Sequence, residues 1–113
     1  MDESEQMPAL RWAFSEYRFV FRVHAHFEAM VDRLTTEQVR AAGEGAELLE
    51  EYPDRPQGYT KLLLGYAGPD QPVHLVANVA AFEDDASEPI VLVTVYQPEP
   101  PGWRDERTRG GTQ

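Results

Sequence analysis

Two nearly continuous apolar runs in the second half of the chain, residues 73–81 and 90–96, constrain its fold most strongly. Both are rich in β-branched side chains, and runs of this kind are typical of central strands with a covered face. Two further runs, residues 47–52 and 60–66, precede them and are separated by segments with turn chemistry. Because the connections are too short for parallel crossovers, we predict that these four strands form an antiparallel meander.

Residues 17–24 are open to two interpretations. Aromatic side chains and valine alternate with other residues over this segment, and this period of two predicts a strand. Arg18, Arg22 and His26 also recur every four residues, which is the spacing of one helix face. We predict a strand here and keep the helix as the alternative.

Two helices are predicted to follow. Over residues 24–34, apolar side chains recur at the spacing of an amphipathic helix: Phe27, Met30, Val31 and Leu34. Thr35 and Gln38 then have the sequence of a capping box, in which each of the two side chains bonds a backbone N–H at the start of a helix. This second helix is predicted to end at Gly43 or Gly45.

This order of elements predicts an α+β domain. One or two N-terminal helices pack on one face of a four-stranded antiparallel sheet, or of a five-stranded sheet if residues 17–24 join it. The domain is expected to span residues 10–104. Residues 1–9 and 105–113 are predicted to be a disordered acidic lead-in and a disordered polar tail, because neither has a core-forming pattern. The acidic patch at residues 83–88 is predicted to be a hairpin loop.

The composition excludes several classes of protein. The 113 residues include 20 acidic and 10 basic side chains, and the net charge of −10 repels nucleic acid at long range. The chain has no cysteine, which excludes disulfide scaffolds, zinc ribbons and thiol nucleophiles and fits a cytoplasmic protein. No apolar run is long enough to span a bilayer, so no membrane association is expected.

Histidine and arginine are the residues best suited to chemistry here. General acid–base chemistry needs a group that gains and loses a proton, and a developing negative charge needs a cation beside it. Histidine titrates near neutral pH, and arginine binds phosphate through two N–H groups at once. The candidate cluster lies on one face of the predicted strand and shortly after it: Arg18, Arg22, His24, His26 and Arg33. The structural alternative is a solvated face whose arginines pair with carboxylates.

No cofactor and no metal site are predicted. His24 and His26 stand two residues apart, which fits one face of a strand, but no third ligand accompanies them. The sequence also lacks a glycine-rich phosphate loop with its lysine and the Gly-x-Ser-x-Gly motif of serine hydrolases.

Several motifs, taken in order, resemble a small bacterial domain family of unknown function. The matching stretches are His24-Ala25, Leu34-Thr35 with Val39, residues 45–52, Leu63-Leu64-Gly65, residues 72–76 with His74, residues 94–98 with Tyr96, and Trp103. Members of this family are often encoded beside zinc-ribbon antitoxins of the MqsA type, and they look like relatives of the RelE and MqsR toxins.

The resemblance implies a RelE-like fold and the function of a toxin-like domain in a bacterial toxin–antitoxin system, acting as a metal-free endoribonuclease. It implies catalytic roles for His24, His74 and Tyr96. Three arginines are the candidates for binding the substrate phosphate: Arg18, Arg22 and Arg33. The expected partners are RNA and an antitoxin or other protein. The structural alternatives are that His74 is a satisfied core residue and that Tyr96 packs with its hydroxyl in water.

The sequence departs from this family at two positions on the first predicted helix. Glu28 and Asp32 stand where the family has arginine. A chain without those cations fits a second interpretation, a catalytically silent, acidic protein-binding module of the same fold. Such a module would bind a basic partner, for example by extending its sheet at an edge strand. A decoy of nucleic acid is a third interpretation, but the acidic residues are scattered rather than aligned.

Overall fold

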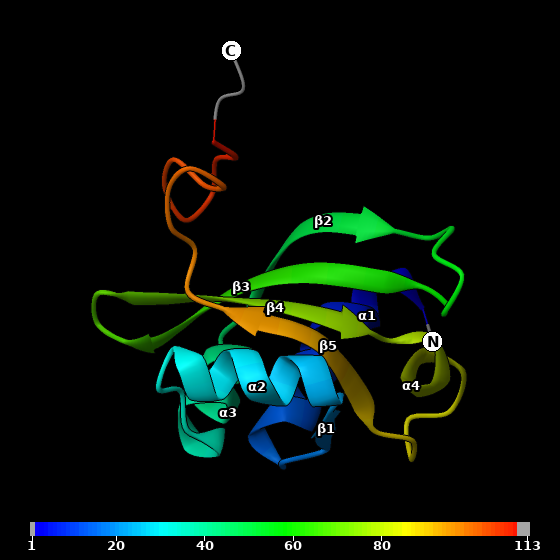
Figure 1. Ribbon diagram of the computed structural model, residues 1–113. Coiled ribbons are helices and arrows are strands. Elements are labelled where there is room, and N and C mark those ends of the chain that lie inside the picture. The colour runs from blue at the N-terminus through cyan, green and yellow to red at the C-terminus, as the bar shows by residue number, and fades with distance from the viewer. Residues whose placement is uncertain (1, 111–113) are drawn as a thin grey trace.

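The computed structural model describes residues 2–110, which form one five-stranded sheet and four helices (Figure 1). In chain order the elements are α1 (Glu3–Ser15), β1 (Phe19–Phe21), α2 (Val23–Val31), α3 (Thr36–Glu44), β2 (Glu47–Tyr52), β3 (Thr60–Gly68), β4 (Gln71–Asn78), α4 (Ala80–Asp84) and β5 (Ile90–Tyr96). The predicted α+β class is therefore confirmed. Residue 1 of the expected lead-in and residues 111–113 of the expected tail lie outside the described residues. No helix within residues 2–110 is both long and apolar enough to cross a membrane.

The strand order across the sheet is β1-β5-β4-β3-β2. Strands β2 to β5 form the predicted antiparallel meander, in which each strand pairs with the next one along the chain. The fifth strand corrects the antiparallel expectation, because β1 pairs with β5 in parallel, with Phe19 opposite Ile90 and Phe21 opposite Leu92. Three helices and three strands separate β1 from β5, which is ample length for a parallel crossover.

Helix α1 forms where the acidic composition predicts a disordered lead-in. Its residues Leu10 and Phe14 are fully buried, and the Phe14 ring lies against Gly43 of α3, where a Cβ atom would come within 2.1 Å of it. Glu3 and Glu5 lie in the first turn, where the partial positive charge of the helix N-terminus favours acidic side chains. The acidic residues thus stabilise the start of a helix, and the contact with α3 orders its end.

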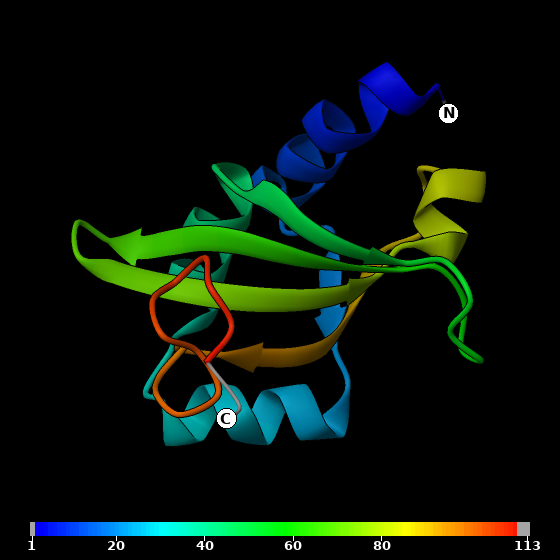
Figure 2. The same ribbon diagram turned by 90° about the horizontal axis from the view of Figure 1, so that it is seen from above.

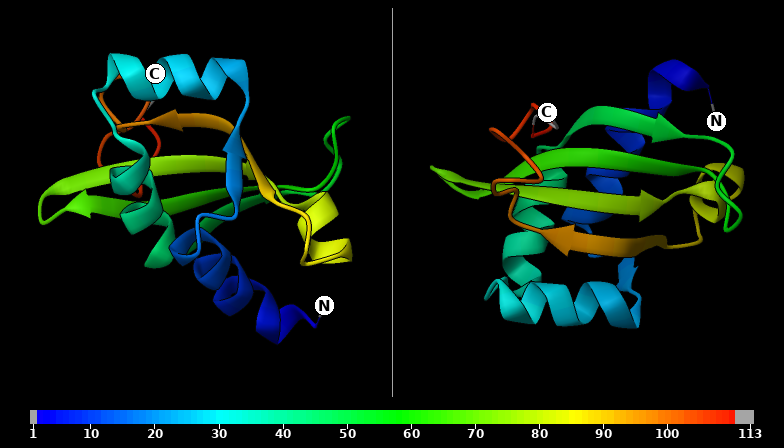
Figure 3. Two further views of the ribbon diagram at one scale, coloured as in Figure 1. Left: turned by 90° about the horizontal axis from the view of Figure 1, so that it is seen from below. Right: turned by 45° about the horizontal axis from the view of Figure 1, so that its top comes forward.

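The helices are distributed unevenly around the sheet (Figures 1 and 3). Helices α1 and α3 lie against one face and enclose a core with buried leucines of the sheet such as Leu63 and Leu75. Helix α3 comes so close to β3 that a Cβ atom on Gly65 would lie 2.0 Å from the carbonyl oxygen of Ala42. Within the described residues the opposite face carries no helix, and the C-terminal loop folds over part of it (Figure 2). A ligand can therefore reach the sheet from this side.

Helix α2 lies along β5 at the edge of the sheet (Figure 3). Its buried side chains are the small ones, Ala25 and Ala29. Three members of the predicted apolar stripe are exposed: Phe27, Met30 and Val31. An amphipathic helix ordinarily buries its apolar stripe, so the periodicity indicates the helix but not the face that packs.

Two carboxylates explain where α2 is placed. Glu28 Oε1 accepts a hydrogen bond from the backbone N–H of Val95 at 3.0 Å, and Asp32 Oδ2 accepts one from the backbone N–H of Gln97 at 2.8 Å. Residues four apart on a helix rise about 6 Å, and residues two apart on a strand are spaced about 6.6 Å. The two carboxylates therefore match alternate N–H groups at the end of β5, one in the strand and one on the residue that follows it. Beyond the short strand β1, α2 closes a strand edge that would otherwise expose unpaired donors.

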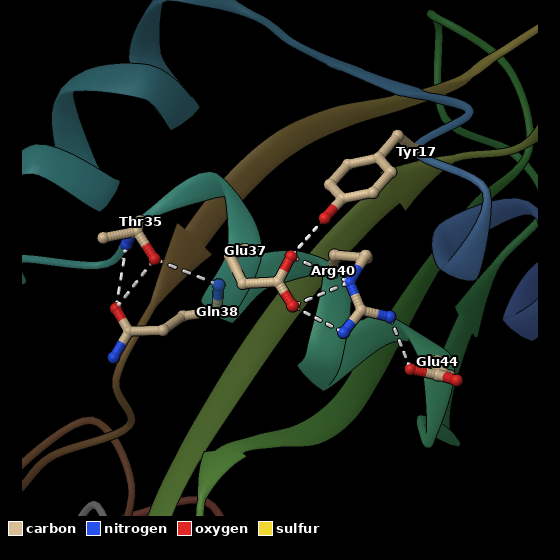
Figure 4. A network of polar contacts seen from close by, with 6 residues as sticks. All are labelled: Tyr17, Thr35, Glu37, Gln38, Arg40 and Glu44. Carbon is tan, nitrogen blue, oxygen red and sulfur yellow. Dashed lines mark hydrogen bonds and ion pairs between the residues drawn. The ribbon is translucent and has the colours of Figure 1, made fainter.

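The start of α3 is the capping box that the sequence predicts (Figure 4). The Thr35 hydroxyl accepts from the backbone N–H of Gln38 at 3.1 Å, and the Gln38 side chain accepts from the backbone N–H of Thr35 at 2.9 Å. Glu37 then contacts both the Arg40 guanidinium and the Tyr17 hydroxyl. Hydrogen bonds from Arg40 and Tyr17 lower the pKa of Glu37 to about 2. Because Tyr17 follows α1, this exposed network joins the first segment of the chain to α3.

Two segments that the composition predicts as loop or disordered tail are instead held by long-range contacts. The acidic patch begins within the short helix α4, whose Phe82 is fully buried and whose Glu83 lies 2.7 Å from Lys61 of β3. In the segment predicted to be a tail, Arg109 forms an ion pair with Glu50 of β2 at 2.7 Å, and the chain folds back onto the helix-free face (Figure 2). Both segments depend on partners that are distant in sequence.

Candidate functional site

A groove of about 260 Å³ crosses the helix-free face of the sheet. Its floor includes a row of cross-strand neighbours, Leu62 of β3, Val76 of β4 and Thr94 of β5. Side chains alternate between the two faces of a strand, so the register of three strands brings these residues together. We call this depression the sheet groove.

Tyrosine and arginine side chains line the sheet groove above this floor. Tyr52 ends β2 and Arg55 lies in the following loop, with its guanidinium 4.5 Å from the centroid of the Tyr52 ring. Tyr96 ends β5, and Arg109 belongs to the C-terminal loop. Planar cations and aromatic rings around an apolar floor suit a ligand that combines an anionic group with a flat ring.

The Tyr96 hydroxyl is held by two buried side chains. It lies 3.0 Å from Nδ1 of His74 and accepts a hydrogen bond from the indole N–H of Trp103 at 3.1 Å. The Trp103 ring also stands edge-on to the imidazole, with 4.3 Å between the ring centroids. Nε2 of His74 lies 2.7 Å from the carbonyl oxygen of Glu106. These contacts join the end of β5 to the C-terminal loop.

His74 is a neutral imidazole in this network. Burial lowers the pKa of His74, and the side chain is fully buried. The carbonyl oxygen of Glu106 can only accept, so Nε2 carries the proton and Nδ1 accepts from the Tyr96 hydroxyl. Burial likewise raises the pKa of Tyr96. The His74 imidazole therefore fixes the direction of the Tyr96 hydroxyl, and one lone pair of the Tyr96 oxygen has no partner among the described residues.

Arg109 is a fixed cation at the groove. Its Nε and Nη2 bind the two carboxylate oxygens of Glu50 at 3.1 and 2.7 Å, and Nη2 also donates to the Tyr52 hydroxyl at 3.0 Å. The hydrogen bonds from Arg109 lower the pKa of Glu50. Arg55, by contrast, makes no ion pair with any residue that the structure describes. Arg55 is thus the cation of the groove that an anionic ligand can pair with most directly.

A second hollow, of about 310 Å³, lies between α2 and the end of β5, and Tyr96 lines it as well as the sheet groove. We call it the helix hollow. His24 lines it from the first turn of α2, is exposed to solvent, and has Nε2 3.3 Å from Oε2 of Glu28. Phe27 and Val31 contribute apolar walls. Tyr96 therefore separates an arginine-lined groove from a histidine-lined hollow.

Of the three residues that the resemblance marks as catalytic, the structure brings two, His24 and His74, close to the third, Tyr96. His74 contacts Tyr96 directly, and His24 shares the helix hollow with Tyr96. No three His, Asp or Glu side chains within residues 2–110 cluster so that they could hold a metal ion.

The three arginines predicted to bind phosphate lie elsewhere. Arg18 lies over the ring of Trp12, with 5.2 Å from its guanidinium carbon to the ring centroid. Arg22 is the N-cap residue of α2, and Arg33 follows α2 in a left-handed conformation with φ 57°. None of the three lines the sheet groove or the helix hollow.

The groove arginines carry no local signal in the sequence. Arg55 lies among turn residues, and Arg109 lies in a polar segment that is 59 residues from its partner Glu50. Trp103, an aromatic residue in that polar segment, is the one indication that this part of the chain has a packed position. Tertiary structure alone brings Arg109 to the sheet.

The fold and its site define a small α+β domain with a helix-free sheet face and a histidine–tyrosine pair at its rim. The chain belongs to the family described as domain of unknown function DUF4258, whose profile matches residues 21–97, more than half of its length. The matched region includes His24, His74 and Tyr96 and ends before Trp103 and Arg109. Comparison with curated proteins and with solved structures gave no match. The predicted membership of a domain family of unknown function is therefore confirmed.

Proposed function

We propose that this domain is a toxin-like endoribonuclease that cleaves single-stranded RNA without a metal. One observation carries the proposal: the Tyr96 side chain stands between the arginine-lined sheet groove and the helix hollow that His24 lines. The resemblance of the sequence to relatives of the RelE and MqsR toxins supports the same class of reaction.

The sheet groove has the groups that RNA binding needs. Arg55 provides a guanidinium group for phosphate, and Tyr52 and Tyr96 provide aromatic rings against which unpaired bases can stack. The net charge of −10 opposes RNA at long range, but carboxylates such as Glu50 are neutralised by ion pairs at the groove. The long-range electrostatic attraction of RNA is therefore expected to be weak, and binding is expected to depend on direct contacts in the sheet groove.

The chemistry begins with removal of the proton from a ribose 2′-hydroxyl. The 2′-oxygen then attacks the adjacent phosphorus, the bond from phosphorus to the 5′-oxygen breaks, and a 2′,3′-cyclic phosphate forms. His24 is the proposed base, because it lines the helix hollow and Glu28 Oε2 lies 3.3 Å from its Nε2. The proton that His24 takes up is returned through water to the departing 5′-oxygen.

Tyr96 and Arg55 support this step. The remaining lone pair of the Tyr96 oxygen accepts a hydrogen bond from the 2′-hydroxyl of a neighbouring nucleotide, because the single proton of the attacking 2′-hydroxyl goes to His24. The guanidinium of Arg55 binds the phosphate oxygens and stabilises the charge that develops on the phosphorane. His74 acts through Tyr96 by fixing the direction of its hydroxyl.

The test is cleavage of end-labelled single-stranded RNA in the presence of a chelator, with the product ends identified by mass spectrometry. We expect 2′,3′-cyclic phosphate ends and no cleavage where a 2′-deoxynucleotide replaces the cleaved residue. His24→Gln is expected to lower the rate about 10²- to 10⁴-fold. His26→Gln is the matched control, because His26 is exposed on the same helix but does not line the hollow.

Arg55→Gln tests the phosphate site and Arg104→Gln is its control, since Arg104 is exposed and lines neither hollow. Arg55→Gln is expected to weaken RNA binding and cleavage, and Arg104→Gln to change neither. Intact RNA after incubation with the wild-type protein, or equal rates for His24→Gln and His26→Gln, would overturn the proposal.

A second candidate is the catalytically silent module of the same fold. The observation that favours it is the role of Glu28 and Asp32, whose carboxylates bond the backbone of β5 at the positions where the resemblance places arginines. The same assay separates the two candidates, because a silent module leaves the RNA intact at every protein concentration.

A further inference from the structure

The outward face of α2 is an apolar surface without a partner in the described chain. Its four large apolar side chains are each more than half exposed: Val23 at 72%, Phe27 at 59%, Met30 at 60% and Val31 at 80%. They recur at i, i+4, i+7 and i+8, so they form one stripe along the helix. A contiguous exposed apolar stripe is the mark of an interaction surface. We call it the α2 stripe.

Basic side chains border the α2 stripe. Arg22 stands at the start of α2, His26 one turn later and Arg33 just past its end. Neither arginine makes an ion pair with a residue in the described part of the chain. The two carboxylates of α2, Glu28 and Asp32, accept hydrogen bonds from the backbone of β5. The two ends of the stripe therefore carry arginines without an ion pair in the described part of the chain, although Glu28 and Asp32 line the adjoining helix hollow and the whole chain carries a charge of −10.

We propose that the α2 stripe binds an amphipathic helix of another protein whose apolar side chains are bordered by carboxylates. A partner helix presents side chains at the same i, i+3, i+4 and i+7 spacing, which matches the stripe. Carboxylates beside those side chains pair with Arg22 and Arg33, and one apolar side chain of the partner fits the helix hollow beside Phe27 and Val31. The inference rests on the surface of α2 and does not depend on RNA cleavage.

Charge also selects against a second copy of this chain as the occupant. If two copies met antiparallel along their stripes, Arg22 of one would approach Arg33 of the other. If they met parallel, Arg22 would approach Arg22 and Arg33 would approach Arg33. Both arrangements place like charges together at the ends of the contact, and such juxtaposition is unfavourable. An acidic partner makes the same apolar contact without this repulsion.

The test is selection of binders from a displayed library of amphipathic helical peptides in which the positions beside the apolar side chains are randomised. Against the wild-type protein we expect enrichment of peptides with Asp or Glu at those positions. Phe27→Asp should weaken binding of the enriched peptides at least tenfold. Trp12→Glu, which changes another exposed aromatic residue on a different helix, should leave binding unchanged. Circular dichroism checks that both variants are folded.

Charge reversal makes the test specific. The double variant Arg22→Glu, Arg33→Glu should enrich peptides with Lys or Arg in place of Asp or Glu. The proposal is overturned if no helix is enriched, if enriched peptides show no acidic preference, or if they bind Phe27→Asp as well as wild type. It is also overturned if sedimentation shows a wild-type dimer that Phe27→Asp dissociates, because the occupant is then a second copy.

Discussion

The hydroxyl of Tyr96 lies 3.0 Å from Nδ1 of His74, and this contact joins the last strand of the sheet to a fully buried imidazole. Trp103 and the carbonyl of Glu106 complete the network from the C-terminal loop. Arg109 belongs to the same loop and lines the sheet groove. The shape of the groove therefore depends on how firmly this network holds the loop.

Tyr96→Phe is expected to destabilise the protein by about 1–3 kcal/mol, because it leaves buried nitrogen atoms of His74 and Trp103 without their partner. Urea unfolding measures the change. Tyr66→Phe is the matched control: the Tyr66 hydroxyl contacts Glu106 Oε2 at the surface, and its loss should change the stability by less than about 0.5 kcal/mol. Equal changes in the free energy of unfolding for the two variants would contradict a stabilising role of the buried network.

Stability is expected to fall as the pH is lowered below about 6.5, the ordinary value for histidine. Burial lowers the pKa of His74, so in this range the unfolded chain binds a proton that the folded protein does not. The loss ends once the pH reaches the lowered pKa of the folded state, and its slope is at most about 1.4 kcal/mol per pH unit. The free energy of unfolding of the wild type and of His74→Gln, measured between about pH 7.5 and pH 5.5, checks this pH dependence. The variant should show the shallower slope, and parallel slopes would contradict the prediction.

Lys61 and Glu83 form a buried ion pair, and removing the charge of one partner alone is expected to destabilise the protein. Lys61 is 1% exposed, and its Nζ lies 2.7 Å from Glu83 and 3.1 Å from Gln6 of α1. Glu83→Gln leaves the lysine charge buried, and we expect a destabilisation of about 3–5 kcal/mol. Glu44→Gln breaks an exposed pair with Arg40 and should cost less than about 1 kcal/mol in the same urea titration. A small effect of Glu83→Gln would mean that water reaches Lys61.

Gly65→Ala is expected to destabilise the protein by about 3 kcal/mol or more, because its Cβ atom would lie 2.0 Å from the backbone oxygen of Ala42. The obstacle is the backbone of α3, so relief requires the whole helix to move away from β3. Gly45→Ala adds the same methyl group where nothing lies within 4 Å, at an ordinary φ of −111°. That control should be neutral or stabilising by up to about 1 kcal/mol. Chemical unfolding measures both changes in stability, and a Gly65→Ala variant as stable as Gly45→Ala would contradict the close contact between α3 and β3.

Local sequence patterns determined much of the secondary structure. The capping box of Thr35 and Gln38 predicts the start of α3, because both hydrogen bonds are made within four residues of the chain. The nearly continuous, β-branched runs predict the central strands, and the short connections between the runs predict the antiparallel meander. The same local motifs also predicted the family to which the chain belongs. Each of these features depends on neighbours in sequence.

Tertiary structure decided which faces pack and which residues meet. The apolar period of α2 is the same whether Phe27 faces the core or solvent, and the backbone N–H groups of β5 select the face that carries Glu28 and Asp32. Arg109 comes to the sheet groove through Glu50, a partner too distant in sequence for any periodicity to reveal. The sequence therefore determined the elements through short-range geometry. The site depends on long-range hydrogen bonds and ion pairs, which exist only once the sheet has formed.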